Sequence, residues 1–202
     1  QKLKEMLPPE TAGKIQRVIV TGCGDSYSAA GAMRPALREL SGIYDCIAPD
    51  VVDFCRYYSE NRILKRHRPE EVLVISISFS GNSVRAAEAL ERAKNLGLYS
   101  LAITGNKASR CGEAAELVLD VETPQGCNTP GLRSYYASLV ALSAVGAYLG
   151  LCRGKLTQER FAQIGAQIRD YTLEFMEHIG DIDTQMFETA CVMKDLRKFE
   201  TI

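Results

Sequence analysis

One stretch, residues 71–97, constrains the fold of this chain more than any other. It begins with a mostly apolar run, residues 72–77, and a run that is apolar on both faces and rich in Val and Ile is typical of a buried parallel strand. Residues 84–96 then place Val, Ala and Leu at three-residue steps, which predicts an amphipathic helix. Between the two lie small polar or flexible residues (Ser78, Ser80, Gly81, Asn82 and Ser83). The stretch therefore predicts a strand, a tight turn and a helix.

The turn at residues 78–83 is the first candidate binding site. It follows the carboxyl end of a parallel strand, where open α/β sheets bind their ligands. It also precedes a helix, and the amino end of a helix has unpaired N–H groups and a positive dipole that attract phosphate. One Ser or Asn at this place would be explained as a helix cap. Three serines are more than a cap requires, so the pattern predicts an anion site built from neutral donors.

A second strand, turn and helix of the same design precede the first. Residues 17–21 are predicted as a strand and residues 27–40 as a helix, which Pro35 is expected to kink or end early. The turn between them reads Gly22-Cys23-Gly24-Asp25-Ser26, and its glycines allow a ligand to approach the backbone closely. It lacks the third glycine of a dinucleotide fingerprint, and no G-K-[ST] follows it, so neither a dinucleotide site nor a P-loop is predicted.

Further strands are predicted at residues 43–48, 98–104 and 115–121, with helices at residues 51–60, 109–114 and 132–149 and a loop at residues 62–68. Five strands that alternate with helices predict an α/β fold with a parallel sheet. We expect the flavodoxin-like strand order 2-1-3-4-5. That order makes the first and third strands neighbours, so their turns would face each other across one crevice, which the loop at residues 122–131 also borders.

Composition narrows the class of protein. The chain has 202 residues, 46% of them hydrophobic and 24% charged, with a net charge of −1. This ordinary globular composition, without a basic cluster, argues against nucleic acid as a partner. No apolar run approaches about 18 residues and the first ten residues contain no apolar signal core, so no membrane association is expected.

The cysteines and histidines predict neither disulfides nor a metal site. The seven cysteines are odd in number, scattered and without a C-x-x-C pair, which indicates reduced thiols in a cytoplasmic protein. Without clustered Cys and His, no zinc site is expected. The two histidines are expected to be structural, His67 in a solvated charged stretch and His178 at the end of a helix. No cofactor is predicted.

The pattern changes after residue 154. Two helices are predicted, at residues 157–177 and 183–194, with Thr157 and Asp183 as caps, followed by the beginning of a strand at residues 195–202. Helix, helix and strand also open the chain. We therefore expect a domain at residues 1–154 and, at residues 155–202, a helical linker into a second domain of the same kind. The apolar residues of these helices predict a contact with another subunit or with that second half.

Four segments resemble the SIS (sugar isomerase) domain family. Residues 22–26 are similar to its G-C/G-G-[TD]-S turn and residues 53–57 to its S-E-F-R-Y stretch. Residues 78–83 fit its S-x-S-G-x-[ST] phosphate turn, and the loop-to-helix passage at residues 128–139 also corresponds. The segments occur in the family's order, and the chain most resembles the first half of two-domain members such as the isomerase part of glucosamine-6-phosphate synthase.

The resemblance implies roles for individual residues. The phosphate of a phosphosugar would be held by Ser78, Ser80 and Ser83 and by the backbone of Phe79. The sugar would be contacted by Gly24, Asp25 and Ser26, by the backbone of Thr129, Pro130 and Gly131, and by Arg133, which could assist the phosphate or the carbonyl or pair with an acid. Only the serine turn also has an argument from the residues themselves.

By the same resemblance the protein would be an enzyme that isomerises, deaminates or deglycates a phosphosugar or amino-sugar phosphate through an enediol or enamine. No catalytic base is identified, because residues 128–134 contain no carboxylate where single-domain isomerases have a glutamate. Two-domain members take the base from their second half. The alternative is a non-catalytic phosphosugar sensor, although residues 1–16 are too short for the DNA-binding domain that such regulators carry. A homo-oligomer, most simply a dimer, is expected.

Overall fold

The structure is a computed structural model that describes residues 2–121, 123 and 131–193. The chain divides into two compact units, residues 1–161 and residues 162–202.

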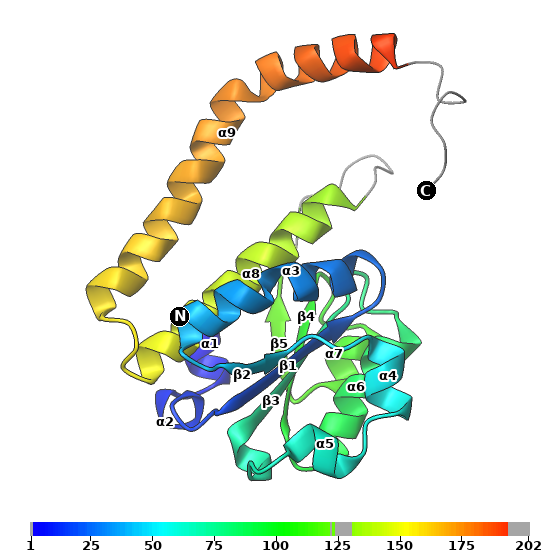
Figure 1. The fold of residues 1–202 in the computed structure, drawn as a ribbon, viewed down its shortest axis with the longest axis vertical. Coiled ribbons are helices and arrows are strands. Elements are labelled where there is room, and N and C mark those ends of the chain that lie inside the picture. Colours follow the sequence, from blue (N-terminus) through cyan, green and yellow to red (C-terminus); the bar gives the residue numbers. More distant parts are fainter. Residues whose placement is uncertain (1, 122, 124–130, 194–202) are drawn as a thin grey trace. The chain divides into compact units, whose positions relative to one another are not determined.

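Within the described part of the first unit, five parallel strands form one sheet (Figure 1). Their bounds are Arg17–Gly22 for β1, Asp45–Ile47 for β2, Val72–Ile77 for β3, Tyr99–Thr104 for β4 and Leu117–Asp120 for β5. The strand order is β2-β1-β3-β4-β5, which confirms the order expected from the sequence. Strands β1 and β3 pair along their whole length, from Arg17 opposite Val72 to Gly22 opposite Ile77.

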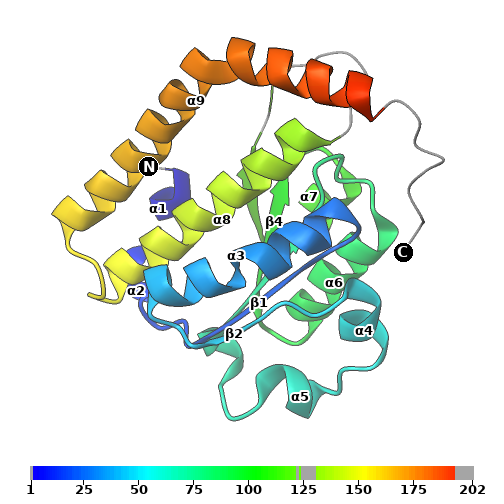
Figure 2. The same cartoon turned by 45° about the horizontal axis from the view of Figure 1, so that its top comes forward.

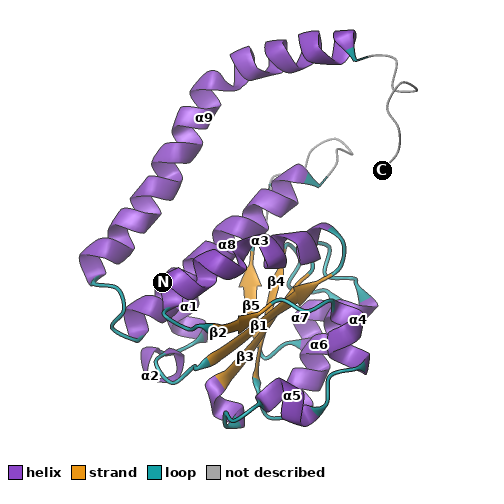
Figure 3. Ribbon diagram, viewed as in Figure 1, coloured by secondary structure: helices purple, strands orange, loops and turns teal. Residues whose placement is uncertain are grey.

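Helices cover both faces of this sheet (Figure 3). One layer contains α1 (Lys2–Met6), α2 (Pro9–Ala12), α3 (Asp25–Ser41) and α8 (Leu132–Cys152), and α3 and α8 lie side by side in both views (Figures 1 and 2). The other layer contains α4 (Val51–Arg56), α5 (Glu60–Leu64), α6 (Val84–Asn95) and α7 (Arg110–Ala114), with the 3-10 turn η1 (Pro69–Glu71).

The burial of strand β3 explains why residues 72–77 have the apolar pattern of a central strand. All six of its residues are buried. Leu73 and Ile75 pack into the core beneath α3 and α8, whereas Val72 and Val74 pack into the core beneath α4 and α6. Successive side chains of a strand point to opposite faces, so a strand covered on both sides is mostly apolar on both. The one polar residue of β3, Ser76, is buried and donates a hydrogen bond to the carbonyl of Ala86 (3.0 Å).

Three local expectations were wrong. The early end of α3 at Pro35 does not occur: the helix continues to Ser41, and Ala30 and Leu37, both fully buried, anchor it on either side of the proline. The helix expected at residues 51–60 is two short helices, α4 and α5. Because Ser59 accepts a hydrogen bond from the backbone N–H of Arg62 (3.2 Å) and starts α5, the expected loop at residues 62–68 begins inside a helix.

A charged cluster occupies the amino edge of the sheet, opposite the serine turn. The guanidinium of Arg17 is 1% exposed and donates to the carbonyl oxygens of Ile63 (2.7 Å) and Arg62 (3.2 Å) and to the carboxylate of Asp45. A ring nitrogen of His67 lies 3.1 Å from the other oxygen of that carboxylate, and the His67 side chain is only 14% exposed. His67 is therefore part of this cluster and not a solvated residue, contrary to expectation.

Helix α8 corrects the expectation that no apolar run approaches about 18 residues, because residues 134–152 contain no charged side chain. It is 21 residues long, and an 18-residue window within it has a mean hydropathy of 1.5, so by length and composition alone it could cross a bilayer. Half of that window is buried inside the unit, against α3 and the sheet. A buried core helix of a soluble protein passes the same test, so this one helix is weak support for a membrane span.

Helix α9 (Gln158–Val192) begins at the end of the first unit and makes up the described part of the second. Thr157 caps it as expected, accepting a hydrogen bond from the N–H of Arg160 (3.1 Å). The expectation of two helices was wrong: no proline interrupts the segment, and a glycine such as Gly180 costs only about 1 kcal/mol in a helix. Asp183 and His178 consequently lie inside the helix, neither as a cap nor at its end. Several large apolar side chains of α9 are exposed, among them Tyr171, Met176, Ile179 and Phe187.

Candidate phosphosugar site

The turn after β3 is fixed by its backbone to the neighbouring strand and turn. Ser78 is buried, and its N–H donates to the carbonyl of Ile103 in β4 (3.0 Å). The carbonyl of Phe79 accepts from the N–H of Gly105 (2.9 Å) and from the hydroxyl of Thr104 (3.3 Å). The turn is thus held on its β4 side by hydrogen bonds that do not involve the hydroxyls of Ser80 and Ser83.

Ser83 starts helix α6. Its side chain accepts a hydrogen bond from the backbone N–H of Ala86 (3.3 Å), so the ordinary role of a helix cap is present. Ser80 is exposed, and its hydroxyl oxygen lies 3.4 Å from the N–H of Asn82. The two hydroxyls therefore stand at the amino end of a twelve-residue helix, where dipole and unpaired N–H groups favour an anion.

The turn after β1 lies against the serine turn. Gly22 has no room for a side chain, because a Cβ atom there would come within 3.0 Å of the carbonyl oxygen of Ile77 and 2.7 Å of the Cβ of Ser26. Gly24 adopts a positive φ of 56° at the start of α3. The sulfur of Cys23 and the hydroxyl oxygen of Ser83 are 3.2 Å apart, so the two turns meet directly, as the strand order predicts.

The beginning of α8 approaches the turn after β1. Gly131 is the N-cap residue of α8, and a Cβ atom built on it would lie 3.3 Å from a carboxylate oxygen of Asp25. The hydroxyl of Ser134 donates to the carbonyl of Gly131 (2.7 Å). Arg133 is exposed in the first turn of α8. Of the residues that the resemblance implies, Thr129 and Pro130 lie outside the described residues.

Three residues that support the serine turn were missed in the sequence: Thr104, Ser109 and Cys111. Gly81 has a φ of 71°, and its carbonyl accepts from the N–H of Cys111 (2.9 Å). The Cys111 thiol is buried and lies 3.6 Å from the carbonyl oxygen of Ser83, and burial raises its pKa, which keeps it a neutral thiol. The only signal was position, because Thr104 ends β4 and the other two follow it, at the same edge of the sheet as the serine turn.

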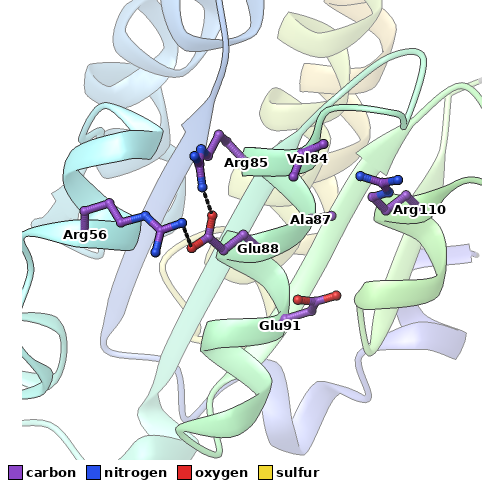
Figure 4. Close-up of a pocket in the computed structure, with 7 residues that line it drawn as sticks. All are labelled: Arg56, Val84, Arg85, Ala87, Glu88, Glu91 and Arg110. Atoms are coloured by element: carbon purple, nitrogen blue, oxygen red, sulfur yellow. Dashed lines mark hydrogen bonds and ion pairs between the residues drawn. The ribbon is translucent and has the colours of Figure 1, made fainter.

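A separate open pocket of about 510 Å³ lies beside the serine turn, on the outer side of α6 (Figure 4). Arg56 and Arg85 both point to the carboxylate of Glu88, at 2.8 and 2.5 Å, while Arg110 of α7 lies on the opposite side. The pocket is lined by none of the residues predicted for phosphosugar binding. Glu88 already compensates the charge of two arginines, Arg56 and Arg85. The pocket is therefore a weaker anion site than the number of its arginines suggests.

No candidate metal centre is found among the described residues, where no three His, Cys, Asp or Glu side chains lie together. Six of the seven cysteines belong to this described part, and each is a free thiol.

Curated relatives of the chain share one enzyme name. The chain is 31% identical over 161 residues to the glutamine–fructose-6-phosphate aminotransferase (isomerizing) of Pseudomonas syringae pv. tomato, an alignment that covers 79% of this chain and 25% of the relative. It is 25% identical over 187 residues to the enzyme of the same name from Clostridium tetani, covering 93% of this chain and 28% of the relative. The chain thus spans about a quarter of the length of these relatives.

Solved structures share the fold. The C-terminal domain of glucosamine-fructose-6-phosphate aminotransferase from Francisella tularensis superposes with a TM-score of 0.81 at 16% identity, over 93% of this chain and 50% of that chain. The Vibrio vulnificus NanR protein complexed with ManNAc-6P has a TM-score of 0.56 at 13% identity, over 85% of this chain and 62% of that chain.

The family model of the SIS domain matches residues 57–149, which include β3, the serine turn and most of α8. The parallel sheet, its strand order and the relatives agree with that match. Residues 57–149 of the chain therefore belong to the SIS domain family.

Proposed function

We propose that the protein binds the phosphate of a phosphosugar at the turn formed by residues 78–83. The hydroxyls of Ser78, Ser80 and Ser83 and the backbone of Phe79 would supply the donors. The observation that carries this proposal is the direct contact between the two turns, 3.2 Å from Cys23 Sγ to Ser83 Oγ, at the amino end of α6. A phosphate bound there would receive neutral donors and the helix dipole together, which is a recurrent way of holding phosphate in α/β proteins.

The sugar itself would extend from this turn toward the start of α8. The proximity of Asp25 to Gly131 supports this direction, because it brings the starts of α3 and α8 close together. Gly24 and Ser26 of the same turn would contact the sugar with Asp25. Thr129, Pro130 and Arg133 complete the proposed contacts, on the strength of the family resemblance.

We further propose that the whole protein catalyses an isomerisation, deamination or deglycation of a phosphosugar or amino-sugar phosphate. Each of these reactions moves a proton between two adjacent carbons through an enediol or enamine, and each needs a general base. The phosphate would act as a remote handle, and its binding energy would position those carbons. The name of the curated relatives, an isomerizing aminotransferase of fructose 6-phosphate, supports an amino-sugar phosphate as ligand. No residue of this chain is assigned as the base, which a second SIS domain or subunit would provide.

A phosphosugar sensor without catalysis is the second candidate. One observation favours it: residues 128–134 contain no carboxylate. The NanR protein, which shares the fold, is complexed with ManNAc-6P, which supports phosphosugar binding for either candidate. In a sensor the same serine turn would bind the phosphate, and ligand binding would change contacts elsewhere.

The wider organisation of the protein is also a proposal. We propose an SIS domain at residues 1–154 and a helical linker at residues 155–202 that leads to a second SIS domain, in a cytoplasmic homodimer. The share of the curated relatives that the chain covers, 25% and 28%, leaves room for such a domain. The exposed apolar side chains of α9 would be covered by it or by the second subunit.

The test is calorimetric titration with fructose 6-phosphate, glucosamine 6-phosphate and inorganic phosphate, followed by product analysis. Saturable binding that Ser80→Ala weakens by about tenfold or more supports the proposed turn, since a donor to a charged group contributes about 1.5–3 kcal/mol. Turnover of a bound phosphosugar favours the enzyme, and binding without turnover favours the sensor. Binding that Ser80→Ala leaves unchanged places the phosphate elsewhere.

A further inference from the structure

The hydroxyl of Ser83 has two partners in the structure. It accepts a hydrogen bond from the backbone N–H of Ala86 at 3.3 Å, and it lies 3.2 Å from the sulfur of Cys23. A serine hydroxyl has one hydrogen to donate and two lone pairs with which to accept. The Ala86 N–H occupies one lone pair, so the direction of the contact with Cys23 decides where the hydrogen of Ser83 points.

Two directions are available for that contact, since either atom could be the donor. If Ser83 donates to the sulfur, its hydrogen is used within the protein and none is left for a ligand. If the thiol of Cys23 donates to the second lone pair of Ser83, the hydrogen of Ser83 is free. A phosphate oxygen is a far stronger acceptor than a thiol sulfur, so a phosphate at the turn would select the second arrangement.

A second thiol, that of Cys111, contacts the backbone of Ser83. The sulfur of Cys111 donates to the carbonyl oxygen of Ser83 at 3.6 Å, and Cys111 is 1% exposed. The N–H of Cys111 also donates to the carbonyl of Gly81 (2.9 Å), which fixes the turn just before Ser83. Ser83 therefore has little freedom to move toward or away from Cys23, and rotation of its hydroxyl hydrogen is the adjustment that remains.

We propose that Cys23 is a positioning residue for phosphate binding: its thiol donates to the Ser83 hydroxyl oxygen, so that the Ser83 hydrogen is directed at the phosphate. This inference rests on the proposed function of the serine turn. It assigns to Cys23 a role that a small apolar residue cannot fill, whereas a serine can, because a hydroxyl also donates one hydrogen. Cys23 lies on the turn after β1, so the inference also makes phosphate binding depend on contact between the two turns.

The experiment is a double-mutant cycle between Cys23 and Ser83, read out as the dissociation constant of fructose 6-phosphate by calorimetry. Cys23→Ala should weaken binding by about three- to tenfold, the range of one neutral hydrogen bond, and Cys23→Ser should restore it to within about twofold of the unaltered protein. In a Ser83→Ala background, Cys23→Ala should have no further effect, because the hydroxyl that Cys23 orients is gone. Thermal unfolding of each variant checks that the turn is intact.

The inference is overturned if Cys23→Ala binds as the unaltered protein does, if Cys23→Ser is as weak as Cys23→Ala, or if Cys23→Ala weakens binding equally with and without the Ser83 hydroxyl. Failure of the proposed function has a different signature. In that case the unaltered protein does not bind the phosphosugar, or Ser80→Ala leaves its affinity unchanged. Sensitivity to Ser80→Ala without coupling between Cys23 and Ser83 overturns the positioning role alone.

Discussion

Gly81 and Ser109 lie so close that a Cβ atom on Gly81 would stand 1.8 Å from the hydroxyl oxygen of Ser109. The same atom would also come within 2.9 Å of the hydroxyl of Thr104, and the φ of 71° at Gly81 disfavours any other residue. The serine turn is therefore shaped by a glycine that packs against the last residue of β4, Thr104, and against Ser109 beyond it.

We predict that Gly81→Ala lowers the free energy of unfolding by about 3 kcal/mol, as the sum of left-handed backbone strain and overpacking. Phosphosugar affinity should fall with it, because the turn must move to relieve the clash. Gly154→Ala is the matched control: Gly154 has a similar φ of 73° but open space around its Cβ position. Chemical denaturation and calorimetry of both variants test this, and equal stability losses for the two would contradict the role of packing.

The double role of Ser83 gives a second prediction. Ser83→Ala should lower the free energy of unfolding by about 1 kcal/mol, because it removes the cap of α6, and should also weaken phosphosugar binding. Ser59→Ala removes the cap of α5 far from the site, so it should have a similar effect on stability and none on affinity. Denaturation and titration of the two variants separate capping from ligand binding. Unchanged affinity of Ser83→Ala would exclude its hydroxyl as a phosphate donor.

The charged cluster at the amino edge of the sheet predicts a pH dependence of stability. Partial burial acts to raise the pKa of Asp45, but hydrogen bonds from His67 and Arg17 outweigh it and hold the pKa below its ordinary value of 3.8. As the pH falls, the unfolded chain therefore takes up this proton before the folded protein does. The contribution of Asp45 to stability is complete above about pH 3.8 and is lost as the pH falls through the lower folded value.

Asp45→Asn tests this cluster. At pH 7 the variant should be less stable by about 3 kcal/mol, because the buried guanidinium of Arg17 loses its charged partner. The difference from the unaltered protein should shrink as the pH falls below 3.8. Urea denaturation across this pH range measures it, with Asp53→Asn, an exposed position on α4, as the control. A difference that stays constant with pH would argue against the ion pair.

The arginine-lined pocket beside α6 is an alternative location for a phosphate. We predict that substitutions in this pocket do not affect phosphosugar binding. Arg110→Ala and Glu88→Gln should each change phosphosugar affinity by less than about twofold, and Glu88→Gln should cost less than about 1 kcal/mol of stability, as exposed ion pairs do. If Glu88→Gln instead strengthened binding by freeing Arg56 and Arg85, the phosphate would belong to that pocket.

The number and order of the strands could be predicted because the inner strands β1, β3 and β4 are buried on both faces, which makes them short, mostly apolar runs separated by turns. The order 2-1-3-4-5 followed from the alternation of strands and helices, and with it the meeting of the turns that carry Cys23 and Ser83. These inferences depend on the backbone pattern, which a single sequence carries well.

Contacts between distant residues could not be predicted in the same way. Nothing near His67 in the sequence reveals that Asp45 lies 3.1 Å away, because that pair depends on how the segment after β2 returns to the sheet. The support of Gly81 by Ser109 has the same origin. Residues 157–194 were predicted as two helices, with Asp183 as the cap of the second, whereas α9 continues through Asp183 as one helix.

The serine turn, residues 78–83, contains no ionisable side chain. Dipoles and hydroxyls act over a few ångströms, whereas attraction between full charges extends to the Debye length and is screened by dissolved ions. Affinity at such a turn should therefore vary little with ionic strength. When no ligand is bound, the turn also contains no like-charged side chains that would repel one another. The turn itself would then recognise the phosphate by contact geometry at close range, and it would add little electrostatic steering from a distance.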